Sequence, residues 1–321
     1  MISLRQAGEA VGVFYSGPMA GLWSGPRRAI ACATALAGAS LLFAAPAGAH
    51  GVAGNRLFPA TLAIDDPAVG DELTLPSVAV FPTGDDPAAT ETDISGEFDK
   101  RITKQFHISV GETWTHLSEP DGPPQSGFQN FDTGLKYQFV TSEEHEAIVS
   151  AGLHVEWGGT GSSAVGADKI TTVTPTIYFG KGLGDLPESA SWARPLAVTG
   201  VVAYAIPTKG DGSRILRSGF TVQYSLPYLT QHVRDTDWPD FFKHLIPLVE
   251  VALNTPVTNA QGAPTTGTVN PGVIWTGQHF QVGVEAIVPI NRVSGKGVGG
   301  VASLDFFLDD LLPHSIGKPI W

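Results

Sequence analysis

Residues 276–291, TGQHFQVGVEAIVPIN, carry the pattern that decides the fold. From Phe280 to Ile290 every second residue is apolar, and the residues between them are mostly polar or small. Because successive side chains of a strand point to opposite faces, one face is continuously apolar. That face extends over about eleven residues, close to the roughly 9–11 that a tilted strand needs to cross a bilayer. A strand of a soluble sheet gives the same alternation but usually has about 5–6 residues.

The same alternation recurs along the chain, in eleven further stretches. They are residues 73–82, 92–101, 105–117, 128–140, 146–157, 170–180, 196–206, 220–228, 245–255, 269–276 and 297–308. Pro76 weakens the first of them, because proline cannot donate to a strand ladder. Twelve strands is an even number, as bacterial single-chain barrels require. The sequence therefore predicts an all-β chain that forms an antiparallel transmembrane β-barrel of about 12 strands over residues 73–310.

The connections between the predicted strands are a second test. If the N-terminus lies in the periplasm, every second connection should be periplasmic and short. The turns near residues 100–104, 142–144 and 276–278 are short, and most alternate connections are longer and rich in small polar residues. Two connections, 182–192 and 232–242, are long where short ones are expected. The second, HVRDTDWPDFF, is compatible with a short interfacial helix or with a cover over the barrel.

Tryptophans are a third test, because membrane barrels carry aromatic girdles at the headgroup level. Five of them fall at or near predicted strand ends: Trp114, Trp157, Trp192, Trp238 and Trp275. Aromatic residues near loops can equally pack the edge of a soluble core. The combination with strand length and turn length favours the membrane barrel.

The start of the chain resembles a secretory signal. Arg27 and Arg28 precede an apolar run that ends in Ala47-Gly48-Ala49, a small-x-small cleavage site. We expect residues 1–49 to be a signal peptide, and a true start at Met19 would give it a more usual length. Beyond residue 50 no stretch has 18 consecutive apolar residues, so a helical membrane span is not expected there.

Removal of residues 1–49 changes the composition of the mature chain. The single cysteine, Cys32, is lost, so the mature chain offers neither thiol chemistry nor a disulfide. The 19 basic and 31 acidic residues fall to 16 and 30, a formal charge of −14. Such acidity argues against nucleic acid as a partner. It is compatible with a cation-tolerant pore and also with an ordinary acidic secreted protein.

Two segments flank the predicted barrel. Residues 50–72 have no steady period, yet Leu57, Phe58, Leu62 and Ile64 need an apolar environment. We expect this segment to be either a plug inside the barrel or a periplasmic extension. Residues 311–321 form a C-terminal tail.

No enzyme motif is present: GxSxG and HExxH are missing, and the glycines at 295–300 lack the Lys-Ser/Thr of a phosphate loop. His154 and Glu156 share a strand face with His107, but isolated residues at this spacing are more often polar lumen residues than metal ligands. Ser142 and His145 lie close together in one turn, where such residues are usually solvated. We assign no catalytic residue, cofactor or metal.

The inward faces of the predicted strands share a polar character. Twelve residues are candidates for lining the lumen: Asp132, Lys136, Gln138, Glu146, His154, Glu156, Gln223, Glu250, Asn254, Gln281, Glu285 and Asp305. Carboxylates outnumber cations, which favours cations or neutral polar solutes if the pore is open. A hydrogen-bonded network filling a closed interior is the alternative, because twelve strands lie between the filled eight-stranded barrels and the open porins.

Five stretches resemble a known group, the outer-membrane transporters associated with the meta-pathway of phenol degradation. They are TGLKYQF (133–139), TPTIYFGKGLGDLP (174–187), ARPLAVTGVVAYAIPT (193–208), FTVQYSLPYL (220–229) and PGVIWTGQHFQVGVEAIVPI (271–290). The resemblance covers most of residues 70–310 and implies an outer-membrane barrel that passes small, often hydrophobic molecules. Trp321 departs from the usual pattern, in which a C-terminal aromatic ends the last strand, because Pro313 and Pro319 intervene.

The leading hypothesis is an outer-membrane channel or transport barrel for small molecules, hydrophobic ones included. Its partners would be the lipid bilayer of the outer membrane, the solute and the barrel-assembly machinery. A soluble periplasmic β-barrel or sandwich that binds an apolar ligand is the second hypothesis. A lipid-modifying enzyme of the outer membrane is the third.

Overall fold

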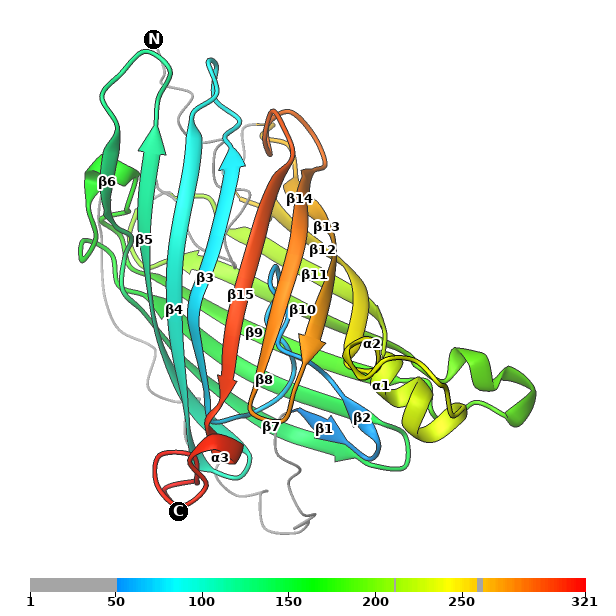
Figure 1. Cartoon of the computed structure of the whole chain (residues 1–321). Helices are drawn as coiled ribbons and strands as arrows, with labels where there is room; N and C mark the ends of the chain where they lie inside the picture. Colours follow the sequence, from blue (N-terminus) through cyan, green and yellow to red (C-terminus); the bar gives the residue numbers. More distant parts are fainter. Residues whose placement is uncertain (1–50, 211, 259–261) are drawn as a thin grey trace.

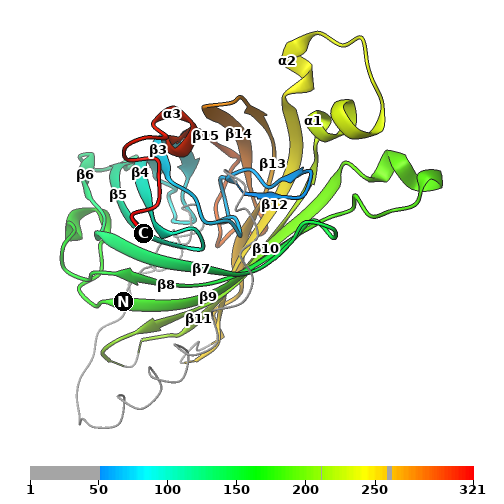
Figure 2. The ribbon, with the colours of Figure 1, turned by 90° about the horizontal axis from the view of Figure 1, so that it is seen from below.

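In the computed structural model, residues 51–210, 212–258 and 262–321 are described. The predicted signal peptide and the alternative start at Met19 lie outside these residues. Twelve long antiparallel strands of the described chain form one closed barrel (Figures 1 and 2). They are β3 (Glu72–Pro82), β4 (Thr90–Thr103), β5 (Phe106–Ser118), β7 (Asp132–Ser142), β8 (Ala147–Glu156), β9 (Thr172–Gly182), β10 (Leu196–Pro207), β11 (Ile215–Tyr224), β12 (Leu245–Pro256), β13 (Thr266–Thr276), β14 (Phe280–Pro289) and β15 (Gly299–Phe307).

Consecutive strands of the barrel are hydrogen-bonded neighbours, and pairing of β15 with β3 closes the ring. All twelve stretches with alternating apolar residues correspond to these strands, so the predicted fold class is confirmed. Pro76 is accommodated in β3 by a shift of register between Thr74 and Ser77. Such a bulge leaves a residue outside the ladder, which is where a proline costs least.

Two strand predictions were wrong in detail. The strand predicted at 220–228 is β11, which begins at Ile215 and ends at Tyr224. It ends there because the Ser225 hydroxyl accepts a hydrogen bond from the Tyr228 backbone N–H and caps the short helix α1 (Leu226–Tyr228), with a proline in the first turn. The stretch predicted as one strand at 128–140 begins with the last residue of β6 (Gln125–Phe128), which pairs with β5 beyond the start of β7, and β7 itself begins at Asp132.

The outer surface of the barrel is apolar. Large apolar side chains on alternate strand positions are exposed: Val80, Ile94, Ile108, Val110, Leu135, Tyr137, Phe139, Ile177, Phe179, Val202, Phe220, Val222, Val249, Phe280, Val282 and Val284. The alternate side chains, which face inward, include many buried polar groups such as Thr199, Gln223 and Glu250. A soluble barrel would bury its apolar face and expose its polar one, so this exterior is that of a transmembrane barrel.

The two ends of the barrel differ. The end that receives residues 51–71 and the C-terminal tail, here called the terminal end, has short turns between β4 and β5, β7 and β8, and β13 and β14, as predicted. The two long connections at this end carry short helices. They are η2 (Glu188–Ala193) after β9, and α1, η3 (Leu229–Val233) and α2 (Asp240–Lys243) after β11. No helix among the described residues is long and apolar enough to cross a membrane.

Both flanking segments lie against the barrel. Residues 51–71 begin with a small hairpin of β1 (Val52–Ala53) and β2 (Arg56–Leu57) and run through the barrel interior (Figure 2). The tail follows α3 (Leu308–Leu311), and the backbone N–H groups of Ile320 and Trp321 donate to the carbonyls of Arg101 and Ile102. The Trp321 side chain is 85% exposed. The last residue therefore lies at the end of β4 and is not part of β15.

The two faces of β14 give a sharp test of this architecture. Val284 is exposed on the outer face and Glu285 is buried on the inner one. Val284→Lys should prevent assembly, since a lysine facing lipid near the midplane costs about 2–4 kcal/mol. Glu285→Gln should leave assembly intact. Heat-modifiable migration on gels measures the assembly of both variants. Equal assembly of the two variants would contradict the assigned faces.

Candidate functional site

The barrel interior is occupied by residues 51–71, which are held by the wall at several points. The strongest is the Glu250 carboxylate of β12, which accepts hydrogen bonds from the backbone N–H groups of Leu62 (2.8 Å), Ala63 (3.1 Å) and Ile64 (2.9 Å). Hydrogen bonds to an ionised acceptor are about twice as strong as neutral ones. Leu62 also packs against Ile246, Leu248 and Ile274, and Ile64 against Tyr178 and Val201.

The opposite wall holds the next residues of the segment. The Lys136 ammonium of β7 donates to the Asp65 carboxylate (2.9 Å) and to the Asp66 carbonyl (3.0 Å), and it lies over the Tyr178 ring. The Ser150 hydroxyl donates to the Pro67 carbonyl. Because β12 and β7 lie on different sides of the ring, the segment spans the lumen from wall to wall.

A third anchor lies at the terminal end. Arg56 is fully buried, and its guanidinium donates to the Glu146 carboxylate (3.2 Å) and to the carbonyls of Pro195 (2.9 Å) and Arg194. It also stacks on the Tyr228 ring at 3.9 Å. Burial lowers the pKa of Arg56, although the Glu146 carboxylate acts to raise it. Burial raises the pKa of Tyr228 to about 12. This cluster ties the β1–β2 hairpin to both long connections.

Adjacent carboxyl groups in the segment have different charge states. Burial acts to raise the pKa of Asp65, but Lys136 and His154 outweigh it and hold that pKa below its usual range. Burial raises the pKa of Asp66 to about 6. Lys136 acts to lower that pKa, and the negative charge of Asp65 acts to raise it. Asp65 therefore stays ionised as the partner of Lys136, whereas Asp66 takes up a proton as the pH falls through about 6.

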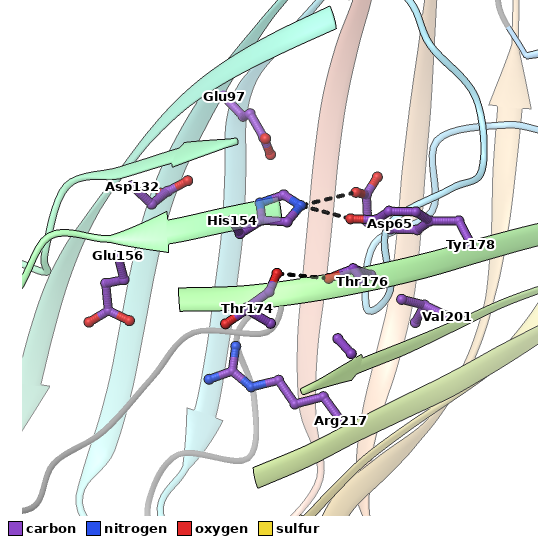
Figure 3. Close-up of a pocket in the computed structure, with 11 residues that line it drawn as sticks. Asp65, Glu97, Asp132, His154, Glu156, Thr174, Thr176, Tyr178, Val201 and Arg217 are labelled. Atoms are coloured by element: carbon purple, nitrogen blue, oxygen red, sulfur yellow. Dashed lines mark hydrogen bonds and ion pairs between the residues drawn. The ribbon is translucent and has the colours of Figure 1, made fainter. Parts of the chain in front are cut away.

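Two cavities flank the segment, and both contact Asp65 and Glu97. The first has a volume of about 60 Å³ and also contacts Asp132, His154, Glu156, Thr174, Thr176, Tyr178, Val201, Ala203 and Arg217 (Figure 3). The second has a volume of about 70 Å³ and is lined by six acidic residues, Asp65, Asp66, Glu72, Glu97, Asp99 and Asp305. Acidic side chains outnumber basic ones around both cavities.

The twelve candidate lumen residues lie in several settings. Eight are buried: Asp132, Lys136, Glu146, Gln223, Glu250, Gln281, Glu285 and Asp305. Four are partly buried: Gln138, His154, Glu156 and Asn254. Residues that contact the interior segment are Lys136, Gln138, Glu146, His154, Glu250 and Gln281. Residues that contact a cavity are Asp132, His154, Glu156 and Asp305. Gln223, Asn254 and Glu285 contact neither of these cavities.

Some cavity residues were missed at the sequence level. Glu97 and Asp99 alternate with apolar or small residues in a run in which Asp93, Ser95 and Arg101 share the same face. That period of two is a sufficient signal, yet neither residue is among the twelve candidates. Arg217 was missed because it precedes residue 220, where the predicted strand began. Asp65 could not be placed, because its segment has no period.

The alternative chemistries can be compared with the geometry. The His154 ring bonds to the Tyr178 hydroxyl (2.7 Å), and the Glu156 carboxylate accepts from the Asn130 amide (2.8 Å). Among the described residues, no group of three or more His, Cys, Asp or Glu is arranged to hold a metal. The Ser142 hydroxyl accepts from the His145 backbone N–H (3.4 Å), and the His145 ring lies 3.4 Å from Asp185. The contact between Ser142 and His145 therefore runs through the His145 backbone N–H.

Comparison with known proteins finds no matching family model and no matching curated protein. Solved structures with a similar arrangement include the KdgM porin, at 11% identity over 72% of this chain and 98% of that one (TM-score 0.43). An outer membrane channel from Pseudomonas putida F1 has 12% identity over 74% and 94% (TM-score 0.45). LpxR from Salmonella typhimurium has 12% identity over 74% and 99% (TM-score 0.41).

The Glu250 anchor can be tested by amide hydrogen exchange. Glu250→Ala removes the acceptor of three backbone N–H groups, and hydrogen bonds to charged groups contribute about 1.5–3 kcal/mol. Exchange at residues 62–64 should therefore accelerate about tenfold or more, since 1.4 kcal/mol is a factor of ten. Thr199→Val, at a buried position of the same wall, is the matched control and should leave this exchange unchanged. Unchanged exchange in Glu250→Ala would contradict the anchor.

The charge state of Asp66 makes the docking of residues 51–71 depend on pH. The pKa of Asp66 in the folded protein, about 6, lies above the ordinary 3.8. Protonation of Asp66 therefore stabilises the docked segment, fully below about pH 3.8, and this stabilisation is lost as the pH rises through 6. Asp66→Asn should slow amide exchange at residues 62–66, relative to the wild type, at pH 7.5 and have little effect at pH 4. If the ratio of the exchange rates of Asp66→Asn and the wild type is the same at both pH values, Asp66 is not the group responsible for the pH dependence.

Proposed function

We propose that this protein is an outer-membrane channel for small solutes whose pathway is closed at rest by residues 51–71. The observation that carries the proposal is the inverted distribution of polarity: an apolar exterior surrounds a charged interior that holds a separately anchored segment. An even number of antiparallel strands with both flanking segments at one end is typical of bacterial outer-membrane barrels. The expected signal peptide agrees with export.

The inner wall is more polar than the docked segment requires. Among the described residues, the buried side chains of Thr199, Thr221 and Gln223 have polar atoms that make no hydrogen bond within the protein. Each such group costs about 1–3 kcal/mol when it is kept from water. Water in an open lumen would satisfy them. A wall built only to surround a permanent core would have little use for these groups.

The lining of the cavities indicates the kind of solute. Carboxyl groups predominate around both cavities and favour cations or neutral polar groups over anions. Tyr178, Val201 and Ala203 give one side of the first cavity an apolar surface. We therefore infer small molecules with a hydrocarbon or aromatic body and a polar or cationic group. The sequence resemblance to transporters of the phenol meta-pathway points to the same class of hydrophobic solute.

The lipid bilayer surrounds the apolar exterior, and insertion of the strands would depend on the barrel-assembly machinery. The tail is largely exposed, and such machinery could reach its last residue, Trp321, at the end of β4.

Recording from planar bilayers tests the channel. The wild type should open rarely, and Arg56→Ala, which removes an anchor that contacts neither cavity, should raise the open probability and the mean conductance. Arg56→Lys keeps the charge but not the forked set of donors and should lie between the two. An absence of conductance in all three proteins would favour a permanently filled or enzymatic barrel.

Selectivity is measured in the same recordings. In a KCl gradient the open state should select cations, and the double variant Glu97→Gln/Asp99→Asn should shift the reversal potential towards zero without changing the open probability. Anion selectivity would contradict the assignment of these carboxyl groups to the pathway.

A further inference from the structure

The two long connections at the terminal end form an aromatic projection on one side of the barrel. Residues 183–195 and 225–244 lie beside each other there (Figure 2), and the Tyr224 hydroxyl donates to the Trp192 carbonyl at 3.1 Å. Four large aromatic side chains in them are exposed: Trp192 (68%), Trp238 (43%), Phe241 (59%) and Phe242 (48%). The channel function uses none of them.

The projection has a defined conformation. Ser225 caps α1, and the Thr230 hydroxyl bonds back to the carbonyls of Leu226 and Pro227. The buried Arg56 then fixes both connections, because it stacks on Tyr228 and binds the carbonyls that precede β10. The exposed aromatic rings are therefore held in place by the barrel.

These aromatics continue the outer surface of the barrel. Phe241 is nearly parallel to Trp275 of β13, with ring centroids 6.5 Å apart, and Trp275 lies 5.4 Å from Phe280 of β14. The His244 ring adds a contact to Trp275 at 5.4 Å. Phe280 begins the row of exposed residues that continues with Val282 and Val284. We call Trp192, Trp238, Phe241, Phe242, Trp275 and Phe280 the aromatic band.

The chemistry of the band fits one kind of partner. Tryptophan and other aromatic rings favour the level of the lipid headgroups, where the apolar ring meets acyl chains and polar atoms remain hydrated. Arg234, Asp235, Asp237 and Asp240 are exposed between the aromatic residues of the same connection. Their charges need water within a few ångströms of the rings. A headgroup layer offers both environments, whereas an apolar protein groove would strip water from these charges.

We propose that the aromatic band docks on the phospholipid headgroup layer of the leaflet at the terminal end and anchors the barrel there. This inference rests on the proposed transmembrane placement of the barrel. The projection extends the contact with lipid beyond the strands on one side of the barrel only. The same Arg56 cluster that holds residues 51–71 also holds the anchor.

Site-specific fluorescence tests the anchor. In the mature chain, which has no other cysteine, Trp238→Cys and Phe242→Cys are each labelled with an environment-sensitive dye and reconstituted in phosphatidylcholine/phosphatidylglycerol vesicles. The exposed neighbour Asp237→Cys is the matched control, and Val284→Cys on β14 reports the lipid-facing wall. Nitroxide lipids labelled at the headgroup should quench the dyes at 238 and 242 more strongly than the dye at 237. Nitroxides deep in the acyl chains should quench the dye at 284 most.

Each contrary outcome has a distinct meaning. If the dye at 284 is quenched but those at 238 and 242 behave like that at 237, the barrel spans the bilayer and the anchor is disproved. If the dyes at 238 and 242 show blue-shifted emission without quenching by any nitroxide lipid, protein covers the band and the lipid assignment is wrong. If the dye at 284 is not quenched, the transmembrane placement itself fails, and the anchor fails with it.

Discussion

In a bilayer, backbone N–H and C=O groups have no water to bond, so a spanning sheet cannot leave an open edge. The pairing of β15 with β3 meets this requirement here, and the rest of the structure follows from it. Closure gives every strand one face towards lipid and one towards the lumen. The strict alternation of apolar and polar residues in strands such as β14 is the sequence-level consequence. A polar interior is then available for binding, and it has to be filled or hydrated.

The interior segment fills part of that space by polar recognition. Its anchors are a carboxylate that binds consecutive backbone amides, an ammonium between two aspartates, and a buried guanidinium at the rim. These contacts are directional and exchangeable with water, unlike a continuous apolar core. The Asp66 carboxyl group makes docking depend on pH. Burial disfavours its ionised form, so the docked segment is less stable once Asp66 is ionised. Such contacts suit the closed state that we propose, because they bind the segment specifically and can be exchanged for contacts with water.

Much of this could be predicted from the sequence because alternation with period two directly encodes the faces of a strand. All twelve strands were located. Their ends were wrong where local capping intervened, as at Ser225, where Gly, Ser and Pro concealed β6, and at the start of β11, where Ile215–Gly219 were missed. The placement of residues 51–71 could not be predicted, since three-dimensional partners such as Glu250 and Lys136 are far away in the chain. The aromatic connection was noticed at residues 232–242, but its orientation depends on Arg56 and Trp275. Neither contact has a local signature.

Fractionation of the cell envelope decides whether the apolar exterior of the barrel faces lipid. The protein should remain with the outer membrane, require detergent for extraction and migrate faster on a gel before heating than after. Recovery of folded protein from the periplasm without detergent would contradict it. In that case the apolar exterior would have to be covered by another protein, and the interior could not serve as a path across a membrane.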